Sequence, residues 1–228
     1  MEIQILYEDA AIVVCVKPAG MPVQSDKSLD LDLVNWLKNY RCQKEGIKNP
    51  YIGLVHRLDR PVGGVMVFAK TKEAAKSLSR QIQENLTEKR YRCIVAKALP
   101  DQLHQPATEL TDYLKKDGRS NCSTIVSKAD PAGKCAKLQY TVLGVKGDTS
   151  LLEVRLLTGR HHQIRVQMAA HVAGLVGDTK YHSEGQALGR GVGIALYSYA
   201  IGFTHPVNKK KMHFTHLPEG SLWEGYES

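Results

Sequence analysis

The sequence predicts an α+β fold with a mixed, mainly antiparallel sheet and flanking helices. Apolar segments of strand length recur along the whole chain and are separated by turns that contain glycine. Only three stretches carry the apolar spacing of a helix, so strands dominate the pattern. With 228 residues and 43% apolar composition, the chain is long enough to bury a substantial core.

The amino-terminal segment predicts two strands followed by a turn. The segments 3–9 and 11–17 are both mainly apolar and predict one strand each. Glu8 and Asp9, at the end of the first segment, mark the break between the two strands. Pro18–Gly20 then supplies residues typical of a turn. Lys17 therefore stands where the second strand ends.

Two helices and a strand are predicted next. A helix over 31–40 would begin behind Asp30, a residue type that caps helices. Its apolar stripe comprises Leu31, Val34 and Leu37. The strongly apolar run 64–70 predicts a strand, and Thr71 is placed to cap the helix that follows it. The stripe of this second helix comprises Ala75, Leu78 and Ile82.

The carboxyl-terminal half is predicted to consist mostly of strands. A helix should begin near Arg160 and direct Ile164, Met168 and His171 inward. The glycine-rich stretch 185–193 lacks the ending of a phosphate-binding loop, and we interpret it as a mobile loop. The expected strands and hairpins of this half are 91–98, 112–126, 138–157, 194–203 and 210–217.

Composition points to an intracellular protein with a polyanionic partner. The 31 Lys and Arg residues exceed the 23 Asp and Glu residues, which gives a net charge of +8. The five cysteines are odd in number and never spaced as Cys-x-x-Cys, so neither a disulfide framework nor a zinc site is expected. Because no secretion signal or membrane-spanning apolar run is found, we expect a cytoplasmic location.

Asp59 lies between two arginines in the segment "GLVHRLDRPVGGVMVFAK", residues 53–70. Arg57 and Arg60 would favour its ionised form, which suits a nucleophile or an electrostatic partner. The alternative is an ordinary solvated ion pair in a loop. This segment by itself does not separate the two interpretations.

A second basic segment, "LLTGRHHQIRVQMAAH", places Arg160 and Arg165 five residues apart. Guanidinium groups can pair with a carboxylate or with phosphate, so the two arginines could divide these tasks. A solvated helix face is the alternative. The adjacent His161 and His162 do not have the i, i+4 spacing of a helical zinc site, so no metal is expected and we expect them to serve in positioning or phosphate contact instead.

Three separated segments together resemble the RluA-type family of RNA pseudouridine synthases. "HRLDRPVGG" (56–64) is similar to the family's catalytic motif, "KRYRCIV" (89–95) to its Lys-x-Tyr strand, and "TGRHHQIRVQMA" (158–169) to its arginine-containing element. Weaker similarities cover both ends of the chain, including "GDTKYH" at 177–182. The motifs occur in the family's order, so the resemblance spans almost the whole chain.

The resemblance implies a role for each of several residues. Asp59 would be the catalytic aspartate, Tyr91 would stack on the target base, and Arg165 would pair with the aspartate. Leu196 would form an apolar wall. The remaining excess charge should bind the RNA backbone, because phosphate contacts position RNA without reading its sequence. The candidates for this binding are Lys17, Arg57, Arg60, Arg160 and the run Lys209–Lys211, for which a solvated hairpin tip is the alternative.

Isomerisation of uridine needs neither a redox cofactor nor a metal, so no cofactor is expected. The target base must leave its stack to be reached, and an aromatic side chain offsets part of that cost. Asp59 would either attack a carbon of the nucleotide or remove a ribose proton. A non-catalytic RNA-binding protein on the same fold is the main alternative. A base-releasing glycosidase is less favoured because no second acid adjoins Asp59.

The family resemblance also sets the expected organisation and partners. Residues 1–228 should form a single catalytic domain with a basic cleft and without an added amino-terminal RNA-binding domain. Structured RNA, ribosomal or transfer, is the expected partner; DNA and membrane are not expected, and the protein should be a monomer. Two departures bear on substrate choice: Val62-Gly63-Gly64 stands where Thr-Ser-Gly is usual, and Gln167 where histidine is usual.

Overall fold

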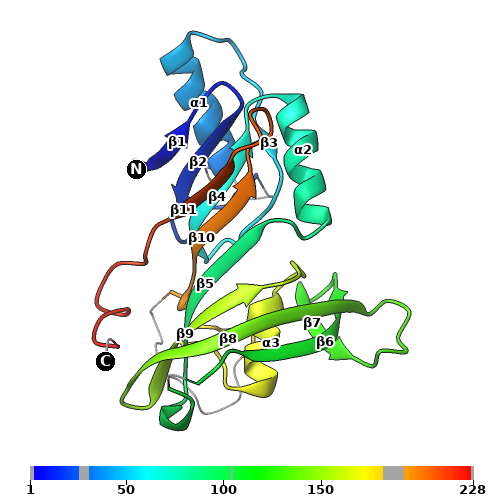
Figure 1. Ribbon diagram of the computed structural model, residues 1–228, viewed down its shortest axis with the longest axis vertical. Coiled ribbons are helices and arrows are strands. Elements are labelled where there is room, and N and C mark those ends of the chain that lie inside the picture. The colour runs from blue at the N-terminus through cyan, green and yellow to red at the C-terminus, as the bar shows by residue number, and fades with distance from the viewer. Residues whose placement is uncertain (1–2, 26–30, 104, 182–192, 227–228) are drawn as a thin grey trace. The chain divides into compact units, whose positions relative to one another are not determined.

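The computed structural model describes residues 3–25, 31–103, 105–181 and 193–226 (Figure 1). The chain divides into two compact units, which are described separately. The first comprises Met1–Glu88 and Ser198–Leu217, and the second comprises Lys89–Tyr197 and Pro218–Ser228. Both units combine helices with antiparallel strand pairs, which confirms the predicted α+β class.

The first unit is built on strands in the order β1-β2-β4-β10. The pairs β1–β2, β2–β4, β3–β4 and β10–β11 are antiparallel. α2 packs against β3 and β4 (Figure 1). The strands are β1 (Ile5–Glu8), β2 (Ile12–Lys17), β3 (Gly53–Leu54), β4 (Gly63–Ala69), β10 (Leu196–Thr204) and β11 (Lys211–Thr215), and the helices are α1 (Leu33–Glu45) and α2 (Lys72–Gln83).

The core of the first unit follows the two-residue period of its strands. Alternate residues of β2 and β4 point to one face, where α2 packs on them and β10, the neighbour of β4 in the sheet, adds its own apolar side chains. The Thr71 side chain accepts a hydrogen bond from the Ala74 backbone N–H, as its predicted capping role requires. Central members of this core are Ile12, Val14, Val65, Val67, Leu78, Ile201 and Phe203.

α1 begins later than predicted. Its N-cap is Asp32, whose carboxylate accepts from the Asn35 backbone N–H at 2.8 Å, whereas Asp30 lies outside the described residues. Leu37 is buried as predicted, and Val34 is half-buried. The prediction was wrong for Leu31, which lies before the helix and is 52% exposed, and Leu33 is buried in its place.

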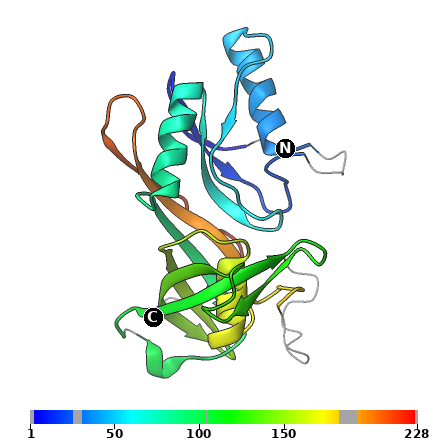
Figure 2. The same ribbon diagram turned by 90° about the vertical axis from the view of Figure 1, so that its right-hand side faces the viewer.

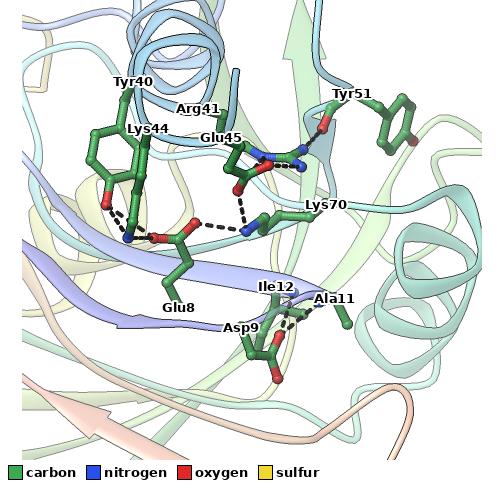
Figure 3. Close-up of polar contacts among 10 residues, drawn as sticks. All are labelled: Glu8, Asp9, Ala11, Ile12, Tyr40, Arg41, Lys44, Glu45, Tyr51 and Lys70. Carbon is green, nitrogen blue, oxygen red and sulfur yellow. Dashed lines mark hydrogen bonds and ion pairs between the residues drawn. The ribbon is translucent and has the colours of Figure 1, made fainter. Parts of the chain in front are cut away.

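An ion-pair network fastens α1 to the strands of the first unit (Figure 3). Lys70, directly after β4, lies 2.7 Å from Glu8 of β1 and 2.7 Å from Glu45 of α1. Glu45 also binds Arg41 at 2.6 Å, and Glu8 binds Lys44 at 2.7 Å. The Lys70 side chain is only 6% exposed, so its charge depends on these two carboxylates.

The strands of the second unit form a sheet in the order β5-β9-β8-β6-β7, in which every neighbouring pair is antiparallel. Its two predicted hairpins are confirmed, with β6–β7 and β8–β9 each joined by a short turn. α3 packs against β6 and β7 (Figure 2). The elements are β5 (Glu88–Val95), η1 (Pro100–Gln102), β6 (Thr108–Asp117), β7 (Cys122–Val126), β8 (Lys134–Lys146), β9 (Thr149–Leu156) and α3 (Gln163–His171).

α3 differs from prediction at its carboxyl end. Ile164 and Met168 are buried as expected, but His171 is exposed and its Nε2 lies 3.0 Å from Asp112. His171 closes the helix, and its exposed imidazole pairs with the mostly buried carboxylate of Asp112 instead of packing in the core. The predicted loop at 185–193 lies, except for Gly193, outside the described residues. None of the described helices has the length and apolar content to cross a membrane.

Candidate active-site residues

The eight predicted site residues divide equally between the two units. Lys17, Arg57, Asp59 and Arg60 belong to the first, and Tyr91, Arg160, Arg165 and Leu196 belong to the second. The proposed pairing of Asp59 with Arg165 joins residues of different units and stays a prediction. Within each unit, however, the surroundings of these residues are well defined.

Asp59 lies half-buried in the loop between β3 and β4. Its backbone carbonyl accepts from the Val62 N–H at 3.0 Å, which closes a turn directly after it. Upstream, His56 Nε2 accepts from the Val67 N–H of β4 at 3.1 Å. The loop that carries the carboxylate is thus attached to β4 on one side of Asp59 and closed by a turn on the other.

Lys17 lies beneath this loop and not on a surface. Its side chain is fully buried, and Nζ donates to the carbonyls of Pro18, Met21 and Arg60 at 3.0, 2.7 and 3.0 Å. All three N–H donors of the ammonium are used, so the prediction that Lys17 contacts RNA phosphate does not fit its position. Burial, opposed by the attraction of Asp59, lowers the pKa of Lys17 to about 8.

Arg60 and Gly20 strengthen the same attachment. The Gly20 N–H donates to the Arg60 carbonyl at 2.9 Å, and Arg60 Nε donates to the Gly20 carbonyl at 3.0 Å. These two bonds and that of Lys17 tie the turn after β2 to the Asp59 loop. Arg57 and Arg60 are both exposed, which agrees with a role in contacting RNA.

The Val62-Gly63-Gly64 departure lies inside the first unit. Val62 is 2% exposed, and Gly64 has a φ of +128° at the start of β4. A Cβ atom on residue 64 would lie 2.1 Å from the Ser198 carbonyl oxygen, so only glycine fits there. The departure therefore changes interior packing and leaves the required glycine in place.

In the second unit, Arg165 is held by an acid that the sequence analysis did not assign. Its Nε and Nη2 donate to the two carboxylate oxygens of Asp178 at 2.8 and 2.6 Å. Arg165 is 4% exposed and Asp178 is 1% exposed. Although burial alone would raise it, the pKa of Asp178 is lowered by the hydrogen bonds and charge of Arg165.

A chain of polar contacts continues from Arg165 to β7. Arg165 Nη1 lies 3.4 Å from His162 Nε2, and His162 Nδ1 lies 2.7 Å from the Tyr181 hydroxyl. Because a guanidinium can only donate, Nε2 is the acceptor and a neutral His162 carries its proton on Nδ1. The Tyr181 oxygen also accepts from the Ser123 N–H at 2.7 Å. The Arg165 guanidinium is thus held by Asp178 through Nε and Nη2 and by His162 through Nη1.

The other predicted residues of the second unit lie on β5, on the turn before α3 and at the start of β10, whose first two residues belong to this unit. Tyr91 on β5 is 8% exposed, and Leu196 at the start of β10 is 5% exposed. Arg160 is exposed, and its Nε donates to the Cys135 carbonyl at 2.8 Å.

Gln167, the second departure, does not face solvent. It is fully buried, and its Nε2 donates to Asp112 at 2.7 Å. Its Oε1 has no hydrogen-bond partner among the described residues. The glutamine therefore acts in the packing of α3 against β6, and we do not assign it a role in contacting substrate.

Asp178 and Tyr181 were not predicted as site residues, and the contact of His162 with Arg165 was not foreseen. Their signal was present in the stretch "GDTKYH", noted only as a weak similarity, and in the second histidine of "GRHHQIR". Within the described ranges, no cluster of three or more His, Cys, Asp or Glu side chains could hold a metal ion.

A comparison with protein families matches residues 11–170 to the family described as RNA pseudouridylate synthase. The chain belongs to this family. The matched region contains the Asp59 loop, the Tyr91 strand and most of α3, so all three motifs of the predicted RluA-type resemblance lie within it. This RNA pseudouridylate synthase family member also has curated relatives that match over most of its length.

Two of these relatives carry names that refer to the ribosome. The "Ribosomal large subunit pseudouridine synthase D" of Zymomonas mobilis is 34% identical over 93% of this chain and 68% of its own length. The "Ribosomal large subunit pseudouridine synthase C" of Buchnera aphidicola is 31% identical over 92% of this chain and 65% of its own length. The chain thus spans about two thirds of the length of the relatives it matches.

Solved structures agree with the fold of the family. The "Human RNA Pseudouridylate Synthase Domain Containing 4" structure superposes with a TM-score of 0.76 at 22% identity, and covers 94% of this chain and 88% of the human one. The "Human RNA Pseudouridylate Synthase Domain Containing 1" structure gives a TM-score of 0.75 at 20% identity, over 95% of this chain and 84% of its own. These similarities show the pseudouridylate synthase fold in this chain.

Proposed function

We propose that this protein is an RNA pseudouridine synthase that isomerises specific uridines to pseudouridine. The observation that carries the proposal is the family match over residues 11–170, which includes Asp59 within its complete motif. The bond between uracil N1 and the ribose breaks, the base turns, and a bond forms between C5 and the same ribose carbon. The hydrogen on C5 leaves as a proton and N1 takes up a proton from solvent, so the product is an isomer of the substrate and no electrons enter or leave the overall reaction.

Asp59 is the proposed catalytic group. Its loop is attached to β4 through His56 and to the turn after β2 through Lys17 and Arg60, which would hold the carboxylate in place during reaction. Arg57 and Arg60, exposed on either side of it, would bind phosphate groups around the target uridine. Tyr91 would stack on the base, with Arg165 as partner of the aspartate and Leu196 as an apolar wall.

Ribosomal RNA of the large subunit is the substrate to test first. The names of the relatives from Zymomonas mobilis and Buchnera aphidicola support this choice. Transfer RNA is the second substrate class, because the net charge of +8 suits any structured RNA. We propose that the protein acts in the cytoplasm as a monomer and without a cofactor.

Tritium release tests the proposal directly. Large-subunit ribosomal RNA and transfer RNA tritiated at uracil C5 would be incubated with the wild type, Asp59→Asn and Asp101→Asn, the last being an exposed acid in η1. We expect release by the wild type and Asp101→Asn, and at least about a hundredfold slower release by Asp59→Asn. RNA binding by Asp59→Asn should stay close to wild type.

The same experiment distinguishes the alternative. A non-catalytic RNA-binding protein would bind these RNAs but release no tritium from either class. Equal release by the wild type and Asp59→Asn would remove Asp59 from the mechanism while keeping the activity.

A further inference from the structure

Lys89 is a buried lysine without a counter-charge in the described part of the chain. It lies on β5, where Lys89, Tyr91 and Cys93 alternate inward, and it is 9% exposed. No described residue accepts a hydrogen bond or forms an ion pair with its ammonium group. A buried charge of this kind is costly unless something pairs with it.

The other buried lysines show how this protein usually satisfies such a group. Lys17 donates to three backbone carbonyls, and Lys70 lies 2.7 Å from each of two carboxylates. Lys89 has neither arrangement among the described residues. Its partner is therefore expected to be a ligand that binds the second unit from outside the chain.

Lys89 has a cationic neighbour, Arg160, and a glycine without a side chain, Gly159, beside its ammonium group. Burial lowers the pKa of Lys89, and the positive charge of Arg160 lowers it further. Its Nζ lies 3.3 Å from the position that a Cβ atom on residue 159 would occupy, so Gly159 leaves space beside the ammonium. Arg160 is exposed and anchored through Nε to the Cys135 carbonyl at 2.8 Å. Two cations beside an open glycine are suited to an anion.

The position of this cation pair favours phosphate over other anions. Tyr91 follows Lys89 by two residues on the same face of β5, a separation of about 7 Å along a strand. If Tyr91 stacks on the flipped base, as proposed above, Lys89 lies within the span of one nucleotide from that base. The oxygens of one phosphodiester can accept from an ammonium and from a guanidinium at the same time.

We propose that Lys89, Arg160 and the space beside Gly159 form a binding site for a phosphodiester group of the RNA backbone. The identification of the anion as RNA phosphate rests on the proposed function. The existence of an anion site rests on the contacts of the second unit alone, and the two can be tested apart.

Inorganic phosphate tests the anion site without RNA. The full chain, labelled with ¹⁵N, would be titrated with phosphate while the amide signals of Gly159 and Arg160 are followed. We expect saturable shifts in the wild type, and affinity at least about tenfold weaker in Lys89→Met. Lys97→Met, which removes an exposed lysine from the same unit, is the matched control and should bind phosphate as the wild type does.

Two further variants separate binding from folding. Lys89→Met removes an unpaired buried charge, so we expect it to unfold at a denaturant concentration no lower than the wild type. Gly159→Ala keeps both charges but places a methyl group 3.3 Å from Nζ, and should also weaken phosphate binding. Wild-type phosphate affinity in both Lys89→Met and Gly159→Ala would overturn the proposal.

Salt dependence tests the link to RNA. Binding of a short oligouridine strand would be measured at several salt concentrations for the wild type, Lys89→Met and Lys97→Met. Loss of one phosphate contact should reduce the slope of log K against log salt by about 0.7 in Lys89→Met only. A slope equal to wild type, combined with phosphate binding that depends on Lys89, would show a site for free anions and overturn the assignment to RNA.

Activity measurements keep this result apart from the proposed function. If the wild type releases tritium but Lys89→Met matches it in KM, in phosphate affinity and in salt slope, the phosphate site alone is wrong. If the wild type releases no tritium from any RNA, the proposed function fails, and the phosphate titration still decides on the anion site.

Discussion

Both carboxylate oxygens of Asp178 bind the guanidinium of Arg165, at 2.8 and 2.6 Å, inside the second unit. An arginine so held on Nε and Nη2 has little rotational freedom, and its Nη1 faces His162. If Arg165 is the partner of the catalytic aspartate, Asp178 sets where that guanidinium is presented. The acid would then support the reaction without touching the nucleotide.

Removing the charge of Asp178 should therefore destabilise the protein strongly. In Asp178→Asn, the buried guanidinium of Arg165 loses its anionic partner, and we expect a loss of about 3–5 kcal/mol in the free energy of unfolding. Urea unfolding at pH 7 measures it. Lys115→Met breaks the half-exposed pair of Lys115 with Asp130 in the same unit and should leave the unfolding midpoint almost unchanged.

The stability difference between the wild type and Asp178→Asn should depend on pH. The pKa of Asp178 is lower in the folded than in the unfolded protein, where it is about 3.9. The stabilisation is therefore complete above about pH 5 and is lost as the pH falls through the folded value. A difference that stays constant down to pH 3 would show that the Asp178 charge is not its cause.

Lys17 should give a pH dependence of the same sign, a stability that rises with pH, but in the alkaline range. Its pKa is about 8 in the folded protein and about 10.5 when unfolded, so the unfolded chain binds more protons between these values. Wild-type stability should thus rise relative to Lys17→Met by on the order of 3 kcal/mol from pH 8 to above pH 10. Unfolding at pH 7, 8.5 and 10 measures the rise. Lys97→Met, at an exposed position, should show none.

Gly64→Ala should prevent normal folding of the first unit. The new Cβ would lie 2.1 Å from the Ser198 carbonyl oxygen, and the φ of +128° would be strained for alanine. We expect a loss of at least about 3 kcal/mol, seen as a lowered thermal midpoint. Gly118→Ala, where nothing lies within 4 Å of the added atom, is the control and should stay within about 1 kcal/mol of wild type. Similar midpoints for both variants would exclude the close approach of β4 to Ser198.

The strands and hairpins were predictable because their signal is local. Each carries its own two-residue apolar period and its own turn residues, as in the hairpin closed at Gly147 with a φ of +54°. The start of α1 was missed because Asp30 and Asp32 are equally good caps in sequence. Only packing of Leu33 and Leu37 into the first unit selects the second.

The site residues that were missed or misplaced depend on contacts that are distant in sequence. Lys17 has the charge of a phosphate-binding residue, but one of its acceptors is the carbonyl of Arg60, 43 residues later. Asp178 follows Arg165 by 13 residues with an irregular segment between them, so no helical or strand period joins the two. The motif resemblance identified the segments that carry the candidate residues. Which of their side chains are exposed, such as Arg57, and which are buried, such as Lys17, depends on the tertiary structure.

The network around Glu8 provides a test of how burial controls ion-pair strength (Figure 3). Lys70 and Lys44 each lie 2.7 Å from a Glu8 oxygen, but their side chains are 6% and 54% exposed. Lys70→Met leaves the half-buried carboxylates of Glu8 and Glu45 without the buried cation that they share, so we expect a loss of about 3 kcal/mol in the free energy of unfolding. Lys44→Met should cost clearly less, because solvent screens the exposed pair.

Salt should separate the two lysines further. Raising the ionic strength to about 1 M shortens the screening length to about 3 Å, which weakens exposed pairs much more than buried ones. The stability difference between the wild type and Lys70→Met should therefore persist in urea unfolding at high salt, while that of Lys44→Met disappears. Combining each variant with Glu8→Gln gives the coupling energies of the two pairs. Equal couplings would mean that distance alone, and not burial, sets the strength of these ion pairs.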